Sequence, residues 1–208
     1  MNFAELRDAS HSEVRQLGYP TSPSLPLLDP QLRLRPEDEI AIRALTLHAV
    51  VAASYGFPKK GSVAWLQQEG LTDSLTAEER AFLAAGSIGD AIRFQVQGEC
   101  LWVFAWTLGK VQRLDFAQSA PNYLVTFYPD LKKGESSAGW REHARLRSEA
   151  EVFAACDLAY CLHWGINQSR IDGRTRSGPV KPYVIWERRR ALEWALGQAQ
   201  WDNVELDT

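Results

Sequence analysis

The stretch SEAEVFAACDLAYCLHWGINQSRI, residues 148–171, decides the fold of this chain. Ser148 and Glu151 have the spacing of a capping box, in which two side chains satisfy backbone N–H groups at the start of a helix. Apolar residues then recur with helical spacing, and one stripe consists of Val152, Ala155, Ala159, Leu162 and Ile166. The other sides are also largely apolar, with Phe153, Cys156, Tyr160, Cys161 and Trp164. A helix that is apolar all round is buried, so this stretch predicts a central helix of a bundle.

A second stretch has the same character. Ser87 with Asp90 repeats the capping box, and the apolar residues that follow predict a helix to about Leu108, where Gly109 ends it. Two central buried helices wrapped by shorter ones make a mainly α, multi-helix single domain. β-branched and aromatic residues at 123–128 also allow a short strand, and the sequence assigns no regular structure to the rest of 110–137.

Prolines divide the chain. Residues 1–18 predict an N-terminal helix, and residues 19–35 predict an extended Pro-rich arm, because repeated prolines fix φ and remove backbone donors. Pro36 is suited to the first turn of a helix, so residues 36–208 predict a helical core domain. The acidic tail 201–208 contains Trp201, Val204 and Leu206, so we expect it to pack back on the body.

Composition excludes several classes of protein. The 208 residues are 45% hydrophobic and 24% charged, within the ordinary globular range, so the bulk of the chain is expected to be folded. A net charge of −3 is too weak to indicate a nucleic-acid partner or adhesion to acidic lipid.

The location is predicted to be cytoplasmic. Three cysteines in apolar surroundings are typical of buried free thiols in a reducing compartment. The N-terminus has no apolar segment of a signal peptide. The most apolar stretch, 96–108, contains Glu99 and is far shorter than the ~20 residues of a membrane span, so no membrane association is expected.

Charged and polar residues within the apolar helices are the candidate site. They are Arg93, Glu99, Asp157, His163, Glu187 and Arg188. Buried charges need partners, so we expect these side chains to meet across the bundle. As an active or binding site, this cluster would use Glu99, Asp157 or Glu187 as acid or base and His163 to carry protons. We favour the alternative of a structural polar network, since a catalytic site also requires a cleft.

Spacing limits the catalytic interpretation. Asp157 and His163 are six residues apart, roughly 120° around a helix, so they cannot form a dyad within it. Known motifs are missing as well: the four histidines form no metal-binding pattern, and neither a nucleophile elbow nor a complete phosphate-binding loop occurs. We therefore expect no metal and no cofactor.

Two further features are candidates for binding. The run Arg188–Arg190 could hold phosphate, but Glu187 and Glu193 beside it favour a solvated, ion-paired face. Trp65 and Trp140 fall near helix starts and loops, where they could be exposed anchors for a partner, whereas the other tryptophans are expected in the core.

Several motifs in order resemble a known family, the bacterial domain-of-unknown-function family 4272. The matching runs are RPEDEI (35–40), RAL (43–45), LTAEERAFL (75–83), WTLG (106–109), RSE (147–149), DLAYCLHW (157–164), ERRRALEW (187–194) and WDNVELDT (201–208). The resemblance covers about residue 34 to the C-terminus. One departure is Ile92-Arg93-Phe94-Gln95, where the family pattern has Trp-Arg-x-Glu. The family name implies no activity, so the resemblance supports the fold and leaves the function open.

Two hypotheses of different class follow. The chain is either a non-enzymatic protein-binding module, with a regulatory or toxin-neutralising role, or a small-molecule enzyme or sensor that uses the buried polar cluster. We favour the protein-binding module, because no complete catalytic constellation occurs and the Pro-rich arm could dock on a partner.

Overall fold

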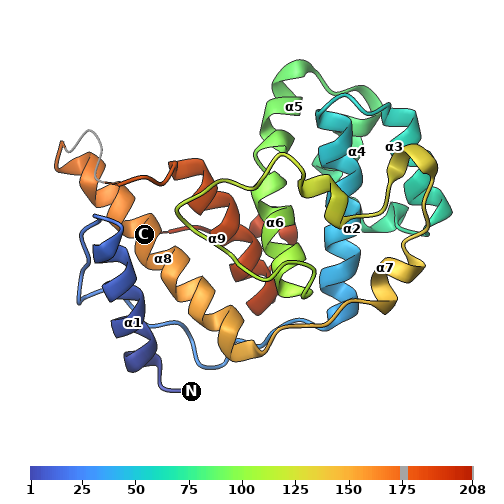
Figure 1. Ribbon diagram of the computed structural model, residues 1–208. Helices are drawn as coiled ribbons and strands as arrows, with labels where there is room; N and C mark the ends of the chain where they lie inside the picture. The colour runs from blue at the N-terminus through green and yellow to red at the C-terminus, as the bar shows by residue number, and fades with distance from the viewer. Residues whose placement is uncertain (174–177, 208) are drawn as a thin grey trace. The chain divides into compact units, whose positions relative to one another are not determined.

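The computed structural model describes residues 1–173 and 178–207. These residues form α-helices and short 3₁₀ helices and contain no strand, so the prediction of a mainly α chain is confirmed. The α-helices are α1 (Phe3–Gln16), α2 (Glu37–Ser54), α3 (Lys59–Gln68), α4 (Ala77–Ala85), α5 (Ile88–Gln95), α6 (Gly98–Thr107), α7 (Ala138–Glu142), α8 (Glu149–Ile171) and α9 (Pro182–Leu196) (Figure 1). The 3₁₀ helices are η1 (Thr72–Ser74), η2 (Leu124–Phe127), η3 (Leu131–Lys133) and η4 (Trp201–Asn203).

Contacts divide the described residues into two compact units. Unit 1 lies within residues 1–35, 115–119 and 147–208, and unit 2 consists of residues 36–114 and 120–146. The boundary that the sequence predicts after residue 35 coincides with a boundary between the units. Residues 36–208, which the sequence treats as one core domain, contribute to both.

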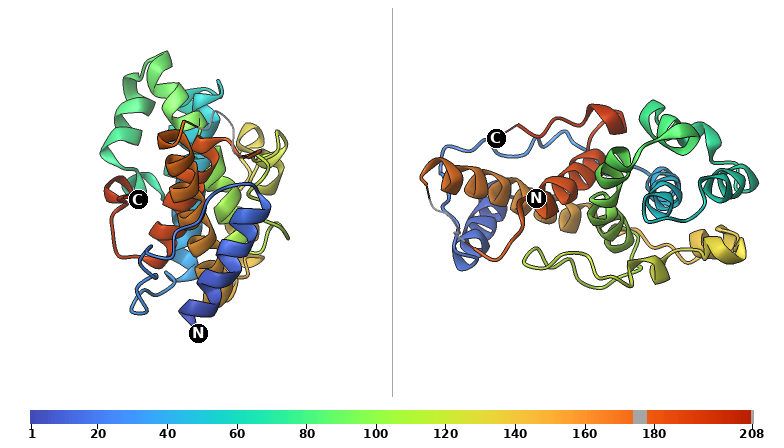
Figure 2. Two further views of the ribbon diagram at one scale, coloured as in Figure 1. Left: turned by 90° about the vertical axis from the view of Figure 1, so that its left-hand side faces the viewer. Right: turned by 90° about the horizontal axis from the view of Figure 1, so that it is seen from above.

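In unit 1, α8 lies between α1 and α9 (Figures 1 and 2). The Ser148 capping box that predicts its start is present, with Glu151 as the reciprocal partner. Val152 and Leu162 are fully buried, and Phe153 meets Phe3 of α1 edge-to-face at 5.4 Å. The central position that the sequence predicts for this helix therefore holds within unit 1.

The arm passes close to α8 where the helix has a glycine. A Cβ atom at Gly165 would lie only 2.8 Å from the carbonyl oxygen of Pro20. The arm then runs beside the C-terminal tail on the same side of unit 1, as the right-hand view of Figure 2 shows. Two backbone hydrogen bonds from Arg33 and Arg35 to the end of α9 hold it there.

In unit 2, α2 packs against α3, α5 and α6. Leu45, Val50, Trp65, Leu66 and Phe82 belong to its buried apolar cluster. An ion pair between Arg43 and Glu79 is buried beside α2, and Glu79 also completes the predicted capping box with Thr76.

The prediction of a second long helix is wrong in one respect, because the helix is interrupted. α5 ends at Gln95 and α6 begins at Gly98. The N–H groups of Gln97 and Glu99 bond to carbonyls three residues back, as in a 3₁₀ turn, so the α-helical hydrogen bonding is interrupted there. The predicted caps at Ser87 and after Leu108 are both present.

The segment 123–128, where the sequence allows a strand, forms the 3₁₀ helix η2 instead. The Tyr128 side chain that ends it is buried, and its hydroxyl donates to the carbonyl of Leu101. The prediction that the tail packs back is confirmed for the described residues, since Trp201 is buried against Trp194.

Within residues 1–173 and 178–207, no helix has both the length and the apolar composition that a membrane crossing requires.

Candidate functional site

A pocket in unit 1 brings together the features expected of a binding site. It has a volume of about 360 Å³, and the arm, α8, α9 and the tail form its walls. We call it the arm–tail pocket. Its lining residues include Pro26, Leu27, Leu28, Asp29 and Leu32 from the arm, Cys156 and Tyr160 from α8, Arg189 and Glu193 from α9, and Val204, Glu205 and Asp207 from the tail.

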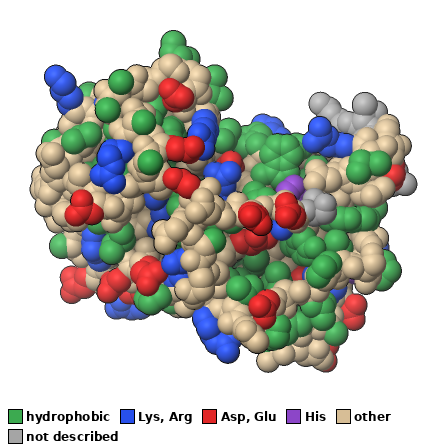
Figure 3. All heavy atoms as spheres, turned by 180° about the vertical axis from the view of Figure 1, so that it is seen from behind, with side chains coloured by type: hydrophobic (Ala, Val, Ile, Leu, Met, Phe, Trp, Pro, Cys, Tyr) green, Lys and Arg blue, Asp and Glu red, His purple; other side chains and the backbone are tan. Residues whose placement is uncertain are grey.

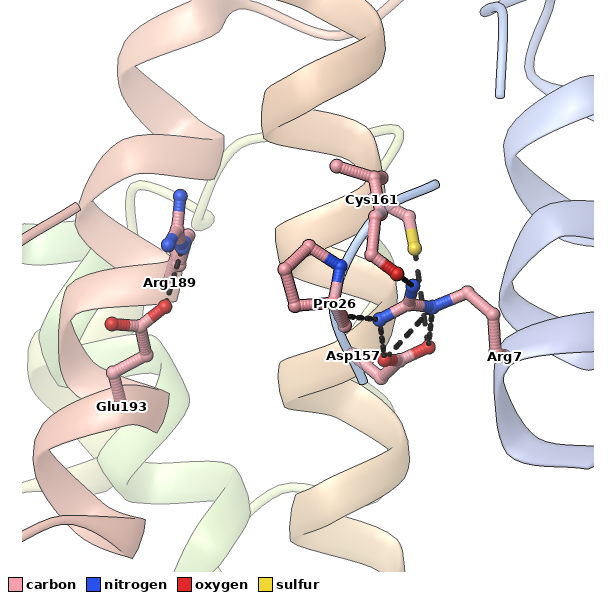
Figure 4. Close-up of polar contacts among 7 residues, drawn as sticks. Arg7, Pro26, Asp157, Cys161, Arg189 and Glu193 are labelled. Atoms are coloured by element: carbon pink, nitrogen blue, oxygen red, sulfur yellow. Dashed lines mark hydrogen bonds and ion pairs between the residues drawn. The ribbon is translucent and has the colours of Figure 1, made fainter. Parts of the chain in front are cut away.

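Arg7 of α1 fixes the arm at the edge of this pocket. Its guanidinium donates to the carbonyl oxygens of Leu25 at 2.9 Å and Pro26 at 2.8 Å (Figure 4). The same guanidinium binds both carboxylate oxygens of Asp157 on α8, with a shortest distance of 2.7 Å. One buried arginine therefore joins α1, α8 and the arm.

This ion pair is sealed from solvent. Arg7 is 6% exposed and Asp157 is 1% exposed. Burial lowers the pKa of Arg7, but the hydrogen bond to Asp157 and the charges nearby outweigh it and raise the pKa above its ordinary value. Cys161 lies 3.9 Å from the same carboxylate, and burial, together with Asp157, raises the pKa of its thiol to about 12. The thiol is therefore protonated and a poor nucleophile at neutral pH.

Arg189 of α9 plays a corresponding part at the tail. It donates to Glu193 one helical turn later and to Nδ1 of His163 at 2.7 Å. It also donates to the backbone carbonyls of Leu206 at 3.3 Å and Asp207 at 2.9 Å. These bonds hold the tail over the pocket.

The ring of Tyr160 lies near both arginines. The guanidinium carbon of Arg189 is 4.6 Å from the ring centroid, and that of Arg7 is 5.6 Å away. Cation–π attraction at these distances orients the half-buried ring at the pocket wall.

Glu193 at the pocket wall and His163, which Arg189 contacts, both have shifted pKa values. Burial raises the pKa of Glu193, and Arg189 only partly opposes this effect. Burial and the charge of Arg189 lower the pKa of His163 to about 4. Because an arginine can only donate, Nδ1 of His163 is the acceptor and the neutral ring carries its proton on Nε2. His163 is therefore a neutral structural acceptor at neutral pH, and its Nδ1 is occupied by Arg189.

The residues of the predicted six-residue cluster are divided between the units, with Arg93 and Glu99 in unit 2 and the other four in unit 1. Asp157 and His163 are buried, as predicted, but their partners are Arg7 and Arg189. In unit 2, Arg93 is exposed and paired with the exposed Glu78, because its side of α5 faces solvent. Glu99, at 4% exposed, accepts a hydrogen bond from the N–H of Ala120.

The arginine run is also more buried than its acidic neighbours indicate. Arg188 is fully buried and donates to the carbonyls of Asp115 and Gln118, while Arg189 is 4% exposed. The expected pairing is present, with Arg189 on Glu193 and Arg190 3.7 Å from Glu187. The prediction of a solvated face is therefore wrong for two of the three arginines.

Neither tryptophan serves as the exposed anchor that the sequence suggests. Trp65 is 3% exposed, and its indole N–H donates to the carbonyl of Glu135. Trp140 is half-buried, stacks on Tyr128 at 5.4 Å and donates to the carbonyl of Phe127. Their position near loops is correct, but those loops cover them.

Sequence reasoning named Asp157 and the ion-paired arginine run but missed other residues that build the site. Arg7 and the apolar residues of the arm carry no motif, and Arg7 is 150 positions from its partner. The pairing of Arg189 with Glu193 at helical i,i+4 spacing was the available signal.

A second hollow, of about 700 Å³, lies in unit 2 and is lined by residues such as His48, Tyr55 and Tyr128. Two of its polar groups are bonded to neighbouring residues of the same hollow: His48 bonds to the carbonyl of Pro129, and Asp130 accepts from the N–H of Lys132. The smaller pocket of unit 1 is therefore the better candidate, despite the difference in volume.

Comparisons with known proteins identify a family and add no activity. Within the described residues, no group of three or more His, Cys, Asp or Glu side chains is placed to hold a metal ion. No curated protein and no solved structure matches the chain. Residues 6–204 match a family described as a domain of unknown function, so the match also includes most of the N-terminal helix and the arm, beyond the stretch that the motifs indicate. The chain belongs to the DUF4272 family.

Proposed function

We propose that this protein is a non-enzymatic protein-binding module, and that the arm–tail pocket of unit 1 docks a segment of its partner. The observation that carries the proposal is the contrast between the two parts of this site. The pocket is open and has apolar arm residues on its wall, with Leu27 50% exposed. The candidate acid and base residues next to it are buried and bound to other groups.

The chemistry of the buried groups favours binding over catalysis. A general acid or base needs a pKa near the working pH and access to the reacting proton. The pKa of His163 is about 4, and Asp157 is held by Arg7. Burial also raises the pKa of the Cys156 thiol well above its ordinary value, so it remains protonated.

The walls of the pocket suit a peptide segment. Pro26, Leu27, Leu28 and Leu32 present apolar surface from one wall, and the tail runs along another. Exposed apolar surface bordered by polar groups is typical of protein interaction sites. A regulatory or toxin-neutralising role requires only such binding, because each acts by occupying the surface of another protein.

We place this binding in the bacterial cytoplasm, without a nucleic-acid partner. In support, Cys100, Cys156 and Cys161 are free and buried, as expected in a reducing compartment. The net charge of −3 is also weak and of the wrong sign for binding nucleic acid.

A small-molecule sensor is the second candidate, and the volume of the pocket favours it. About 360 Å³ lies at the small end of the range of roughly 300–1,000 Å³ that ligand pockets occupy. Such a ligand would bind the isolated chain and stabilise it against heat.

The test is recovery of partners from the native cell extract on the tagged full-length protein, read by quantitative mass spectrometry. We compare the wild type with Leu27→Asp, which places a charge on the apolar wall, and with Asp8→Asn on the exposed side of α1. The proposal predicts a near-stoichiometric protein that is lost with Leu27→Asp and kept with Asp8→Asn. Equal recovery on all three proteins would contradict docking at this pocket.

A further inference from the structure

Charge and shape at the arm–tail pocket indicate what kind of segment it binds, if the proposed docking function holds. The described residues that line it carry four carboxylates, Asp29, Glu193, Glu205 and Asp207, against one guanidinium, Arg189. Their formal charge is −3. Three separate parts of the chain supply the acids: the arm, α9 and the tail.

The positive charge of Arg189 is directed into the protein. Its hydrogen bonds go to Glu193, to His163 and to the tail carbonyls of Leu206 and Asp207. These bonds leave the carboxylates of the tail at the pocket, where Asp207 also raises the pKa of Glu193. These carboxylates would repel an anionic ligand and attract a cationic one.

Glu193 is placed to receive such a cation. One carboxylate oxygen faces Arg189, and Figure 4 shows the other pointing away from it. The side chain is 24% exposed, so a group in the pocket can reach it after shedding part of its water. A charge-assisted hydrogen bond to a partly buried carboxylate is stronger than one at an open surface.

The apolar wall determines what surrounds the cation. Leu27, Leu28 and Leu32 line the pocket together with the acids, so residues next to the cationic side chain would contact leucines. In Figure 3, acidic and hydrophobic side chains likewise lie side by side on the face turned away in Figure 1. A free polyamine would satisfy the acids but leave this wall uncovered.

We propose that the arm–tail pocket binds a lysine or arginine side chain of a partner protein, flanked by aliphatic residues, with Glu193 as its main carboxylate and Asp29, Glu205 and Asp207 as an acidic rim. This is a statement about partner chemistry and rests on the proposed docking function.

The test is selection from a random dodecapeptide display library on the full-length protein. The wild type is compared with Glu193→Gln, with Asp29→Asn on the exposed arm, and with Asp8→Asn as a matched control outside the pocket. Glu193→Gln removes the partner of Arg189 and could unfold the protein. Asp29→Asn leaves that pair intact, so it still tests the acidic rim in that case. Selected peptides are then measured by fluorescence anisotropy at two salt concentrations, with spermidine as competitor.

We expect wild-type and Asp8→Asn selections to share peptides with one Lys or Arg beside Leu, Ile or Val. Affinity should fall roughly tenfold with Glu193→Gln, less with Asp29→Asn, and should weaken as salt rises. Peptides that bind without a cation, or that bind the two pocket variants as tightly as the wild type, would overturn the proposed chemistry while leaving docking intact. Competition by micromolar spermidine would show that the site binds a free amine, and it would also overturn the proposed peptide chemistry. Failure to select any peptide would count against the docking function itself.

Discussion

At the scale of single residues, the pair formed by Arg7 and Asp157 does most to define the site. It is buried on both sides and connects two helices to the arm. Removing one member of a buried ion pair leaves an uncompensated charge, which costs far more than loss of an exposed pair.

We therefore expect Asp157→Asn to lower the free energy of unfolding by about 3–5 kcal/mol. Urea titration followed by tryptophan fluorescence measures this difference. Glu78→Gln, which breaks the exposed pair with Arg93, is the matched control and should cost less than about 1 kcal/mol. Equal effects of the two substitutions would show that the buried pair does not stabilise unit 1 in this way.

His163 adds a pH dependence at the same site. Its pKa is about 4 in the folded protein and 6.5 ordinarily, so below pH 6.5 the unfolded chain takes up a proton that the folded chain refuses. Its contribution to stability is complete above pH 6.5 and is lost as the pH falls toward 4.

His163→Asn keeps an acceptor for Arg189 but cannot titrate. Between pH 7 and pH 5, we expect the variant to lose about 1–2 kcal/mol less stability than the wild type. His48, whose burial lowers its pKa to about 4, still titrates in both proteins. An unchanged pH profile with His163→Asn would contradict the assigned protonation state.

At the scale of secondary-structure elements, the helix starts are where the sequence predicts most. The capping boxes at Thr76, Ser87 and Ser148 are all formed, because each depends on residues three apart. The interruption between α5 and α6 is not predictable in this way, since no proline marks it and a single glycine does not by itself end a helix. The prediction of a strand at 123–128 is wrong, because β-branched and aromatic residues also suit a 3₁₀ turn that buries Leu124 and Tyr128.

Two glycines at the ends of α6 lead to opposite predictions for the stability of their alanine variants. A Cβ at Gly98 of α6 would meet only Leu124, at an ordinary 3.7 Å, so Gly98→Ala should raise stability by about 0.5–1 kcal/mol. Gly109, after α6, has φ +70°, and its Cβ would lie 2.7 Å from the carbonyl oxygen of Arg145. Gly109→Ala should lower stability by more than about 1 kcal/mol, and urea titrations of both variants check the two signs.

The tail is the element whose position depends most on one side chain. Arg189 holds it through the carbonyls of Leu206 and Asp207. We expect Arg189→Met to speed backbone amide exchange in residues 202–207 at least tenfold, as followed by mass spectrometry. Arg190→Met, which removes the neighbouring arginine, is the control and should leave exchange in the tail unchanged. Unchanged exchange in both variants would show that other contacts hold the tail.

At the scale of the whole molecule, sequence predicts the class of fold but not the organisation of the site. Helical periodicity and caps are local, so the mainly α fold follows from them. The arm–tail pocket joins residues 26–32, 156–160, 189–193 and 204–207, and no spacing rule relates segments so far apart. For the same reason the sequence predicts that Asp157 and His163 are buried but does not predict Arg7 and Arg189 as their partners.

The central claim is that the arm–tail pocket docks a partner protein in the cell. The most direct test places a photo-crosslinking amino acid at position 27, on the exposed apolar wall, and at position 8, on the exposed side of α1, in the full-length protein. After irradiation of living cells, the account predicts a discrete covalent adduct with one protein from position 27, weakened by Glu193→Gln and absent from position 8. No adduct from position 27, or the same adduct from both positions, would contradict it.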